Sequence, residues 1–310
     1  MRTAPSTDYV SRLAQRLTCG VQHLQARFLA TEADYAARAQ RADGGFAGRQ
    51  GGSDLYYTSF GLRCAELLGL SDARIREGAA RYLARTPQPR DMIECFCRLY
   101  IGRLLEERGR PADVTELLQR CRAAGGGYGI SPGARPGVYH TFLAGLCCQM
   151  LGSELPGGSD AAAFVLSCGC SDGGFADSAR DQAAEGGTNP TAAATALLAA
   201  GGALDEATAA RAARFLASMQ RPEGGFGANA AAPAADLLST FTALVALGEL
   251  GGLGLVKLAP AARFARALRA PGGGFRGSAD DDAADVEYAY YGLGTLGLLS
   301  LVAAGGVADA

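Results

Sequence analysis

The stretch Phe215-Leu216-Ala217-Ser218-Met219-Gln220-Arg221-Pro222-Glu223-Gly224-Gly225-Phe226 ends in a Gly-Gly-aromatic turn that returns along the chain. The other copies are Gly44-Gly45-Phe46, Gly126-Gly127-Tyr128, Gly173-Gly174-Phe175 and Gly273-Gly274-Phe275. From Tyr128 onward they lie about 50 residues apart, a period typical of folds in which each unit buries its apolar face against its neighbours. The longer interval before Tyr128 leaves room for one more unit, whose turn is replaced by the Pro-rich residues 86–90. The sequence therefore predicts six units.

Composition and charge limit the classes of protein to which the chain can belong. Of its 310 residues 48% are hydrophobic, which is ample for a core, and the formal net charge of -2 gives no reason to expect a nucleic-acid partner. The N-terminal residues include arginines but no apolar stretch, so we expect neither a signal peptide nor a membrane span, and a cytoplasmic protein. The nine cysteines are odd in number and several lie in apolar runs, which predicts reduced core residues.

An apolar run rich in alanine and leucine follows each turn. The runs are too long for strands and predict buried helices. They cover residues 55–68, 92–105, 138–151, 191–204, 237–250 and 286–302. Amphipathic stretches such as residues 205–219 and 258–268 lie between them, and their charged sides predict a layer that faces solvent. The sequence therefore predicts two concentric layers of helices.

The residues at which these runs start can be aligned in one column. The column holds Asp54, Asp91, Gly137, Pro190, Asp236 and Asp285. Aspartate is a good N-cap, and proline fits the first turn, because the first amide groups of a helix lack internal acceptors. A purely structural role is therefore one interpretation of the four aspartates, and a chemical role at the centre of the ring is the other.

Residues 215–226 resemble the Gln-containing repeat shared by the beta subunits of protein prenyltransferases and by squalene-hopene and other class II terpene cyclases. Gln40 to Phe46 has the same spacing, and the resemblance extends from about Gln40 to Leu301. It implies an all-α fold, a single α/α toroid of six inner and six outer helices. Such a domain would span residues 1–310, with an N-terminal outer helix in residues 1–40 and repeats in residues 41–303. It would hold an isoprenoid in an apolar central funnel.

The resemblance also implies a metal site, against which this sequence can be compared. Protein prenyltransferases hold zinc with an Asp-x-Cys pair on the fifth inner helix and a histidine near the start of the sixth. Asp236 matches the aspartate, whereas Leu238 and Tyr288 stand where the cysteine and histidine would be. Leucine has no donor atom, and one carboxylate does not hold zinc alone. We therefore expect no zinc, and Mg²⁺ only if a diphosphate is bound.

The diphosphate site of the resembled family is altered as well. The loop of residues 227–235 contains no Arg or Lys, and Pro190 takes the place of a histidine. Arginines do lie before other inner helices, at Arg49, Arg135 and Arg276. Guanidinium groups beside helix N-termini would suit a diphosphate. The alternative is that these arginines pair with Asp54 or with the acidic run 280–282.

The sixth inner helix starts with Asp285-Val286-Glu287-Tyr288, which resembles a degenerate Asp-x-Asp-Asp motif. Class II terpene cyclases use the middle aspartate of that motif to protonate an alkene or epoxide. An apolar cavity raises the pKa of a carboxyl group, which then stays protonated and acts as a general acid. Glu287 is the candidate acid, with Asp285 in support. The alternative is that the helix dipole alone favours Glu287 in this first turn.

Superposing the six inner helices on their first residues brings two rings of side chains to the funnel. One ring holds Tyr56, Ile93, Tyr139, Ala192, Leu238 and Glu287, and the next holds Tyr57, Glu94, His140, Ala193, Ser239 and Tyr288. Aromatic rings stabilise passing positive charge, but they also fill ordinary cores. Glu94 and His140 are unusual at such positions. They predict a buried acid–base pair or, with Cys95, a relocated metal site.

Three functions remain open at this point. The first is a zinc-independent enzyme that acts on an isoprenoid or another apolar chain in the funnel, by acid-initiated cyclisation or rearrangement. Its candidate catalytic residues are Glu287, Asp285, Tyr288, Asp236, His140 and Glu94, and its candidate substrate-binding residues are Tyr56, Tyr57, Tyr139, Leu238, Ser239, Arg49 and Arg276. The second is a prenyltransferase-like subunit with an altered metal or diphosphate site, which works with a helical partner or as a homo-oligomer. The third is a non-catalytic toroid that binds a lipid or a peptide tail.

Overall fold

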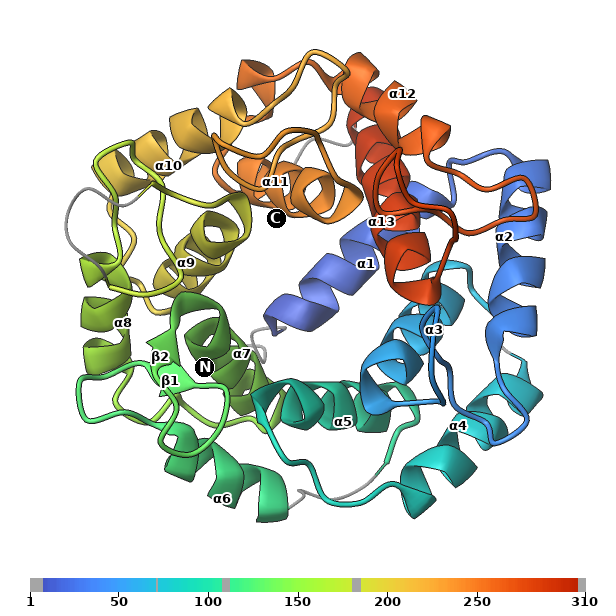
Figure 1. Cartoon of the computed structure of the whole chain (residues 1–310), viewed down its shortest axis with the longest axis horizontal. Coiled ribbons are helices and arrows are strands. Elements are labelled where there is room, and N and C mark those ends of the chain that lie inside the picture. The colour runs from blue at the N-terminus through green and yellow to red at the C-terminus, as the bar shows by residue number, and fades with distance from the viewer. Residues whose placement is uncertain (1–7, 71, 108–111, 180–184, 306–310) are drawn as a thin grey trace, which may run out of the picture.

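Two concentric layers of helices form a closed ring (Figure 1). The computed structural model describes residues 8–70, 72–107, 112–179 and 185–305, and the arrangement below is that of these residues. The inner layer consists of α3 (Leu55–Leu67), α5 (Met92–Leu104), α7 (Val138–Met150), α9 (Thr188–Ala200), α11 (Leu237–Glu249) and α13 (Val286–Ala303). The outer layer consists of α2 (Ala26–Ala39), α4 (Ala73–Arg85), α6 (Ala112–Cys121), α8 (Gly158–Ser167), α10 (Glu206–Ser218) and α12 (Leu258–Ala267). Each inner helix packs against the next, and α13 packs against α3. The predicted all-α toroid of six inner and six outer helices is confirmed.

The Gly-Gly-aromatic turn joins an outer helix to the inner helix that follows it. Gly224 has a φ of 102°, and a Cβ atom there would overlap the backbone of α12, so only glycine fits. The side chain of Phe226 is fully buried, and its N–H donates to Oγ1 of Thr240 on α11 at 2.9 Å. Gln220 Nε2 donates to the carbonyl oxygens of Gly224 and Lys257, at 3.0 and 2.9 Å. The turn, the inner helix and the next outer helix are thus fixed to one another.

Four inner helices begin at an aspartate whose side chain caps the helix. Asp54, Asp91, Asp236 and Asp285 each accept a hydrogen bond from the backbone N–H three residues further along. This bond satisfies one of the amide groups that lack an acceptor within the helix. The structural interpretation of these aspartates is confirmed, and any chemical role must be compatible with it.

The fourth inner helix begins three residues earlier than the sequence predicted. Gly187, and not Pro190, is the N-cap of α9, and Pro190 lies within its first turn. Phe175 bridges to Gly187 and donates its N–H to Thr191, as Phe226 does to Thr240. Asn189 and Pro190 thus occupy the second and third positions of the helix, whereas Ala192 and Ala193, the ring members predicted there, lie about one turn further along and still face the centre of the ring. A proline fits anywhere in the first turn of a helix, because the N–H groups there have no acceptor within the helix. Pro190 therefore indicated the first turn of α9 but not its N-cap.

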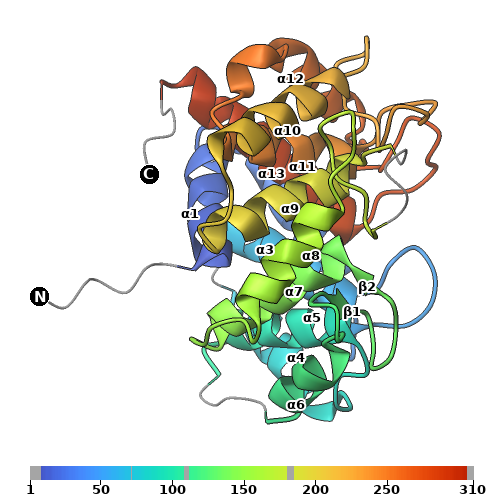
Figure 2. The ribbon, with the colours of Figure 1, turned by 90° about the vertical axis from the view of Figure 1, so that its left-hand side faces the viewer.

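The N-terminal segment forms two helices and not the single outer helix predicted for residues 1–40. Only α2 belongs to the outer layer; α1 (Tyr9–Val21) crosses one end of the ring, away from the loops that precede the inner helices (Figures 1 and 2). It packs against α13, α3 and α7. A Cβ atom at Gly20 would overlap the backbone of Gly297, so two glycines allow α1 and α13 to approach closely.

The remaining elements are short. A 3-10 helix, η1 (Leu253–Leu255), precedes α12, and the two-residue strands β1 (Tyr128–Gly129) and β2 (Pro136–Gly137) pair antiparallel before α7. Within the described ranges, no helix is both long enough and apolar enough to cross a membrane.

Candidate functional site

A cavity of about 480 Å³ lies at the centre of the toroid. Side chains from all six inner helices form its wall, and Tyr9, Val10 and Leu13 of α1 contribute to it as well. Nine aromatic side chains line it: Tyr9, Tyr56, Phe96, Tyr100, Tyr139, Phe142, Phe241, Tyr290 and Tyr291. Its size and largely apolar lining are those of a small-molecule site. The predicted apolar funnel thus has a structural counterpart, to which α1 adds a part that the repeats did not predict.

Three of the predicted site residues line this cavity: Tyr56, Tyr139 and Leu238. Asn189, at the second position of α9, also lines the cavity. The sequence did not indicate it, because the start of this helix was predicted three residues too late. Asn189 Oδ1 accepts a hydrogen bond of 2.6 Å from Thr242 on α11. Apart from tyrosine hydroxyls, the polar lining is therefore sparse.

Glu287 lies behind the cavity wall and is connected to it by one hydrogen bond. Tyr56 Oη donates to Glu287 Oε1 at 2.6 Å, and only 9% of the Glu287 residue is exposed. Burial raises the pKa of Glu287, the nearby charge of Asp285 raises it further, and the hydrogen bond from Tyr56 lowers it in part. The structure thus brings together a predicted acid and a predicted substrate-binding residue from α13 and α3.

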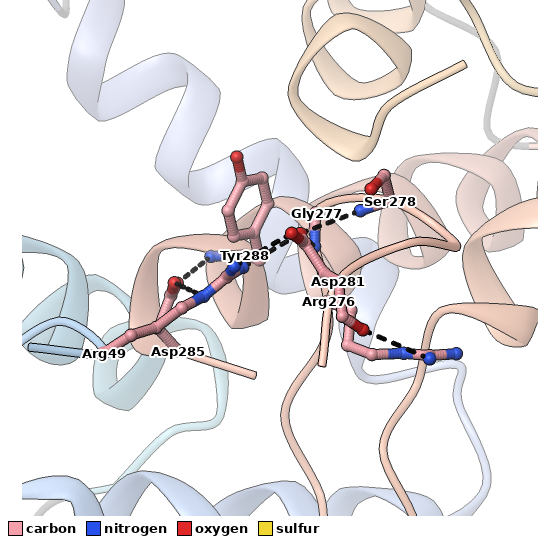
Figure 3. Close-up of polar contacts among 7 residues, drawn as sticks. All are labelled: Arg49, Arg276, Gly277, Ser278, Asp281, Asp285 and Tyr288. Carbon is pink, nitrogen blue, oxygen red and sulfur yellow. Dashed lines mark hydrogen bonds and ion pairs between the residues drawn. The ribbon is translucent and has the colours of Figure 1, made fainter. Parts of the chain in front are cut away.

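A network of charges, which we call the rim cluster, lies where the inner helices begin and consists of Arg49, Asp281, Asp285 and Tyr288 (Figure 3). The guanidinium of Arg49 donates to both carboxylate oxygens of Asp281, at 2.9 and 3.0 Å, and to Asp285 at 3.0 Å. Its charge lies over the ring of Tyr288, 5.4 Å from the centroid. These ion pairs lower the pKa of Asp281, whereas burial raises that of Asp285. Pairing with the acidic run, one of the two alternatives for Arg49, is what the structure shows.

The other predicted loop cations bind backbone carbonyls. Arg276 donates to the carbonyl oxygens of Asp281 and Ala267, and Arg135 donates to that of Ala179. A guanidinium used in this way fixes its loop. Whether either residue also contacts a ligand stays a prediction.

The residues at the zinc position of the prenyltransferases do not fit a zinc site. Asp236 caps α11 and accepts both the N–H and the hydroxyl of Ser239, at 2.7 Å each. Leu238 offers no donor atom and lines the cavity. Tyr288 stacks with Arg49 in the rim cluster. Tyr57, the remaining member of the predicted rings on α3, packs its aromatic ring against that of Tyr56, outside the cavity lining.

Glu94 and His140 do not form the buried acid–base pair or the relocated metal site that the sequence suggested. Arg90 donates to the carboxylate of Glu94 from both its side chain and its backbone, and this lowers the pKa of Glu94. His140 lies beside Asp177, and burial lowers its pKa. No three His, Cys, Asp or Glu side chains in the described residues are grouped so that they could hold a metal ion. The two residues lie in the first turns of neighbouring inner helices, Glu94 paired with Arg90 and His140 near the charge of Asp177.

Arg63 is a cavity residue that the sequence analysis missed. It lies on α3, two turns beyond Tyr56, and only 8% of the residue is exposed. Four aromatic rings surround its guanidinium carbon, those of Phe60, Phe96, Tyr100 and Tyr290. The signal in the sequence was a charged residue within the apolar run 55–68, which holds one other, Glu66.

Comparison with known proteins shows the family. The prenyltransferase alpha-alpha toroid domain family matches residues 70–154, 107–204 and 190–308, which together make up more than half of the chain. The chain therefore belongs to this family, and the resemblance found in the repeats is confirmed. No match was found among curated protein sequences.

Several solved structures share the fold. Candida albicans protein geranylgeranyltransferase-I, complexed with GGPP, has a TM-score of 0.71 at 16% identity, over 88% of this chain and 91% of that chain. The apo type II terpene cyclase MstE from Scytonema has a TM-score of 0.61 at 14% identity, over 94% and 99%. A protein from Actinoplanes has a TM-score of 0.60 at 19% identity, over 90% and 99%. At these identities the likeness concerns the fold alone.

Proposed function

We propose that the chain is an enzyme that acts without zinc on an isoprenoid or another apolar chain held in the central cavity, and that Glu287 supplies the proton that starts a cyclisation. The observation that carries this proposal is the hydrogen bond of 2.6 Å between Tyr56 and Glu287. It connects an acid of raised pKa with the wall of an aromatic cavity. The absence of a donor atom on Leu238, at the zinc position of the family, supports a reaction without zinc.

The geometry supports a proton relay from Glu287 through Tyr56. When the carboxyl of Glu287 is protonated, it donates its proton to the Tyr56 oxygen while Tyr56 transfers its own proton to an alkene carbon of the substrate. The products of this step are a Glu287 carboxylate, an unchanged Tyr56 and a carbocation. A second alkene of the same chain then attacks the cation. A carbon next to the new cationic centre loses a proton to the Glu287 carboxylate through Tyr56, which gives a cyclic alkene and restores the acid. The aromatic faces of Phe241, Tyr290 and Tyr291 stabilise the passing charge.

The structural neighbours support a cyclase with a single toroid. MstE is described as a type II terpene cyclase with geranylgeranyl dihydroxybenzoate as substrate, and the fold similarity covers 99% of its chain. A toroid of this length is therefore enough for such an enzyme. The transferase alternative is favoured less, because Arg49 is already paired with Asp281 and Asp285.

The test is turnover of linear polyprenyl compounds by the wild type and Glu287→Gln, with products identified by gas chromatography and mass spectrometry. Removing a general acid reduces the rate by about 10²-fold to 10⁴-fold, and substrate binding should stay the same. Glu94→Gln is the matched control, because Glu94 is held by Arg90 outside the cavity lining. Equal turnover by wild type and Glu287→Gln would contradict the proposal. Binding without any conversion by the wild type would favour a non-catalytic toroid.

A further inference from the structure

Arg63 is a buried cation for which the fold supplies no anion. Its Nε is buried without a hydrogen-bond partner, and no described residue forms a hydrogen bond or an ion pair with its guanidinium. Only 8% of the residue is exposed, and what surface it has is in the lining of the central cavity. A buried charge without a partner costs free energy, so such an arginine calls for a counter-charge from outside the chain.

Aromatic rings, and not hydrogen-bond acceptors, surround the guanidinium of Arg63. The guanidinium carbon lies 4.1 Å from the ring centroid of Tyr100 and 4.6 Å from that of Phe60. The rings of Phe96 and Tyr290 follow at 5.1 and 5.6 Å. Aromatic faces stabilise a cation but accept no strong hydrogen bonds, so the donors of the guanidinium remain unsatisfied.

The nearest acids are already used. Glu66, beside Tyr100, accepts hydrogen bonds from Arg103 at 3.2 Å and from Tyr100 at 3.3 Å. Glu287 accepts the hydrogen bond from Tyr56. The charge of Arg63 lowers the pKa of Glu287, but less than burial, the hydrogen bond from Tyr56 and the nearby charges change it. Neither carboxylate neutralises the guanidinium directly.

We propose that the central cavity takes an apolar molecule that carries a carboxylate, and that Arg63 binds this carboxylate through its guanidinium edge. A planar carboxylate fits the two parallel N–H donors of an arginine fork. One buried cation matches one negative charge. Among the described residues that line the cavity, Arg63 is the single one with a charged side chain. A diphosphate carries more charge than Arg63 alone compensates, and would leave buried charge unpaired.

The position of Arg63 also orients the ligand. Tyr56 and Arg63 are seven residues apart on α3, which places them on the same face and about 10 Å apart along the helix axis. A molecule whose carboxylate is held at Arg63 therefore extends its apolar chain toward Tyr56 and Glu287. This inference rests on the proposed function insofar as both use the same cavity, but it concerns binding and needs no turnover.

The experiment compares binding of farnesoic acid, its methyl ester and farnesyl diphosphate by isothermal titration calorimetry at about pH 8. We expect wild type to bind the acid at least about tenfold more tightly than the ester, since a charge-assisted bidentate contact contributes more than 1.4 kcal/mol. Arg63→Met should lose this preference while still binding the ester, and Arg63→Lys should retain part of it. Arg214→Met, on the outer helix α10, is the control and should behave as wild type.

Each result bears on the inference in one direction. Equal affinity of wild type for acid and ester would overturn it and leave the proposed apolar-chain site intact. Binding of neither would overturn both. Tightest binding of the diphosphate, or an acid preference that survives in Arg63→Met, would show that another group receives the anion. The comparison of acid and ester on wild type alone decides the question even if Arg63→Met fails to fold.

Discussion

The rim cluster and the cavity treat their arginines in opposite ways. At the rim, Arg49 donates three hydrogen bonds to Asp281 and Asp285, and 31% of its side chain remains exposed. In the cavity, Arg63 is more deeply buried and has aromatic rings around it in place of carboxylates. The deeper cation is thus the one without a counter-charge.

This difference separates charges that the chain pairs with opposite charges from charges that it does not. Asp285 caps α13 and pairs with Arg49, so its carboxylate is satisfied by the chain itself. Glu287, two residues later, accepts a hydrogen bond from a cavity tyrosine, Tyr56. Neighbouring acids on the same helix turn therefore have different tasks, and the predictions below test that division.

The largest effect on stability should come from removing the rim cation. Arg49→Met leaves Asp281 and the buried Asp285 without their cation, and we expect the free energy of unfolding to fall by about 2 kcal/mol at neutral pH. Arg63→Met removes an unpaired buried charge, and the loss of its ring contacts is offset by the relief of desolvation, so a change below about 1 kcal/mol is expected. Denaturant unfolding of the two variants measures both. A larger loss in Arg63→Met than in Arg49→Met would reverse the comparison.

The next effect is on how stability depends on pH. Glu287 beside the cavity and Asp281 at the rim should change the free energy of unfolding in opposite directions as the pH rises. Burial raises the pKa of Glu287 above 4.5, so its contribution to stability is present at low pH and is lost as the pH rises through the raised value. Relative to wild type, Glu287→Gln should therefore gain stability as the pH rises from about 4 through that raised value. Thermal or denaturant unfolding across this range provides the measurement.

Asp281 provides the matched control for that titration. The ion pair with Arg49 lowers its pKa below 3.8, so its contribution is present above that value and is lost as the pH falls. Asp281→Asn should therefore be less stable than wild type at neutral pH, with a difference that shrinks in acid. If the two variants followed pH in the same direction, the division between rim and cavity would be wrong.

The fold was predictable because its signals are local. A glycine turn and an aspartate cap each depend on a few adjacent residues, and five of the six inner helices begin where the sequence placed them. The fourth was misplaced because Pro190 was aligned with the caps of the other helices, whereas the N-cap is Gly187, three residues earlier. The threonine that accepts the aromatic N–H in four units would have set the start at Gly187, since Thr191 lies four residues after Gly187 just as Thr240 lies four after Asp236.

The site was less predictable because it depends on tertiary packing. Tyr56 and Glu287 come from opposite ends of the chain, and only the shared ring positions indicated that they meet. The cage around Arg63 is built from α3, α5 and α13, and the periodicity of the apolar run does not indicate which way the side chain of Arg63 points. The contribution of α1 to the cavity has no counterpart in the repeats.

The smallest effect concerns the contact that joins the acid to the cavity. Tyr56→Phe removes the hydrogen bond that lowers the pKa of Glu287, so the pKa should rise further, and the pH at which Glu287 costs stability should move upward. One hydrogen bond to a charged group contributes about 1.5 to 3 kcal/mol at most, and the phenylalanine ring keeps the apolar contacts of the tyrosine ring, so the net loss of stability should stay near 1 kcal/mol. Tyr57→Phe, on the adjacent residue, should leave the titration of Glu287 where it is in wild type. Identical pH profiles for the two variants would mean that Tyr56 does not hold Glu287, and the proton relay would lose its first step.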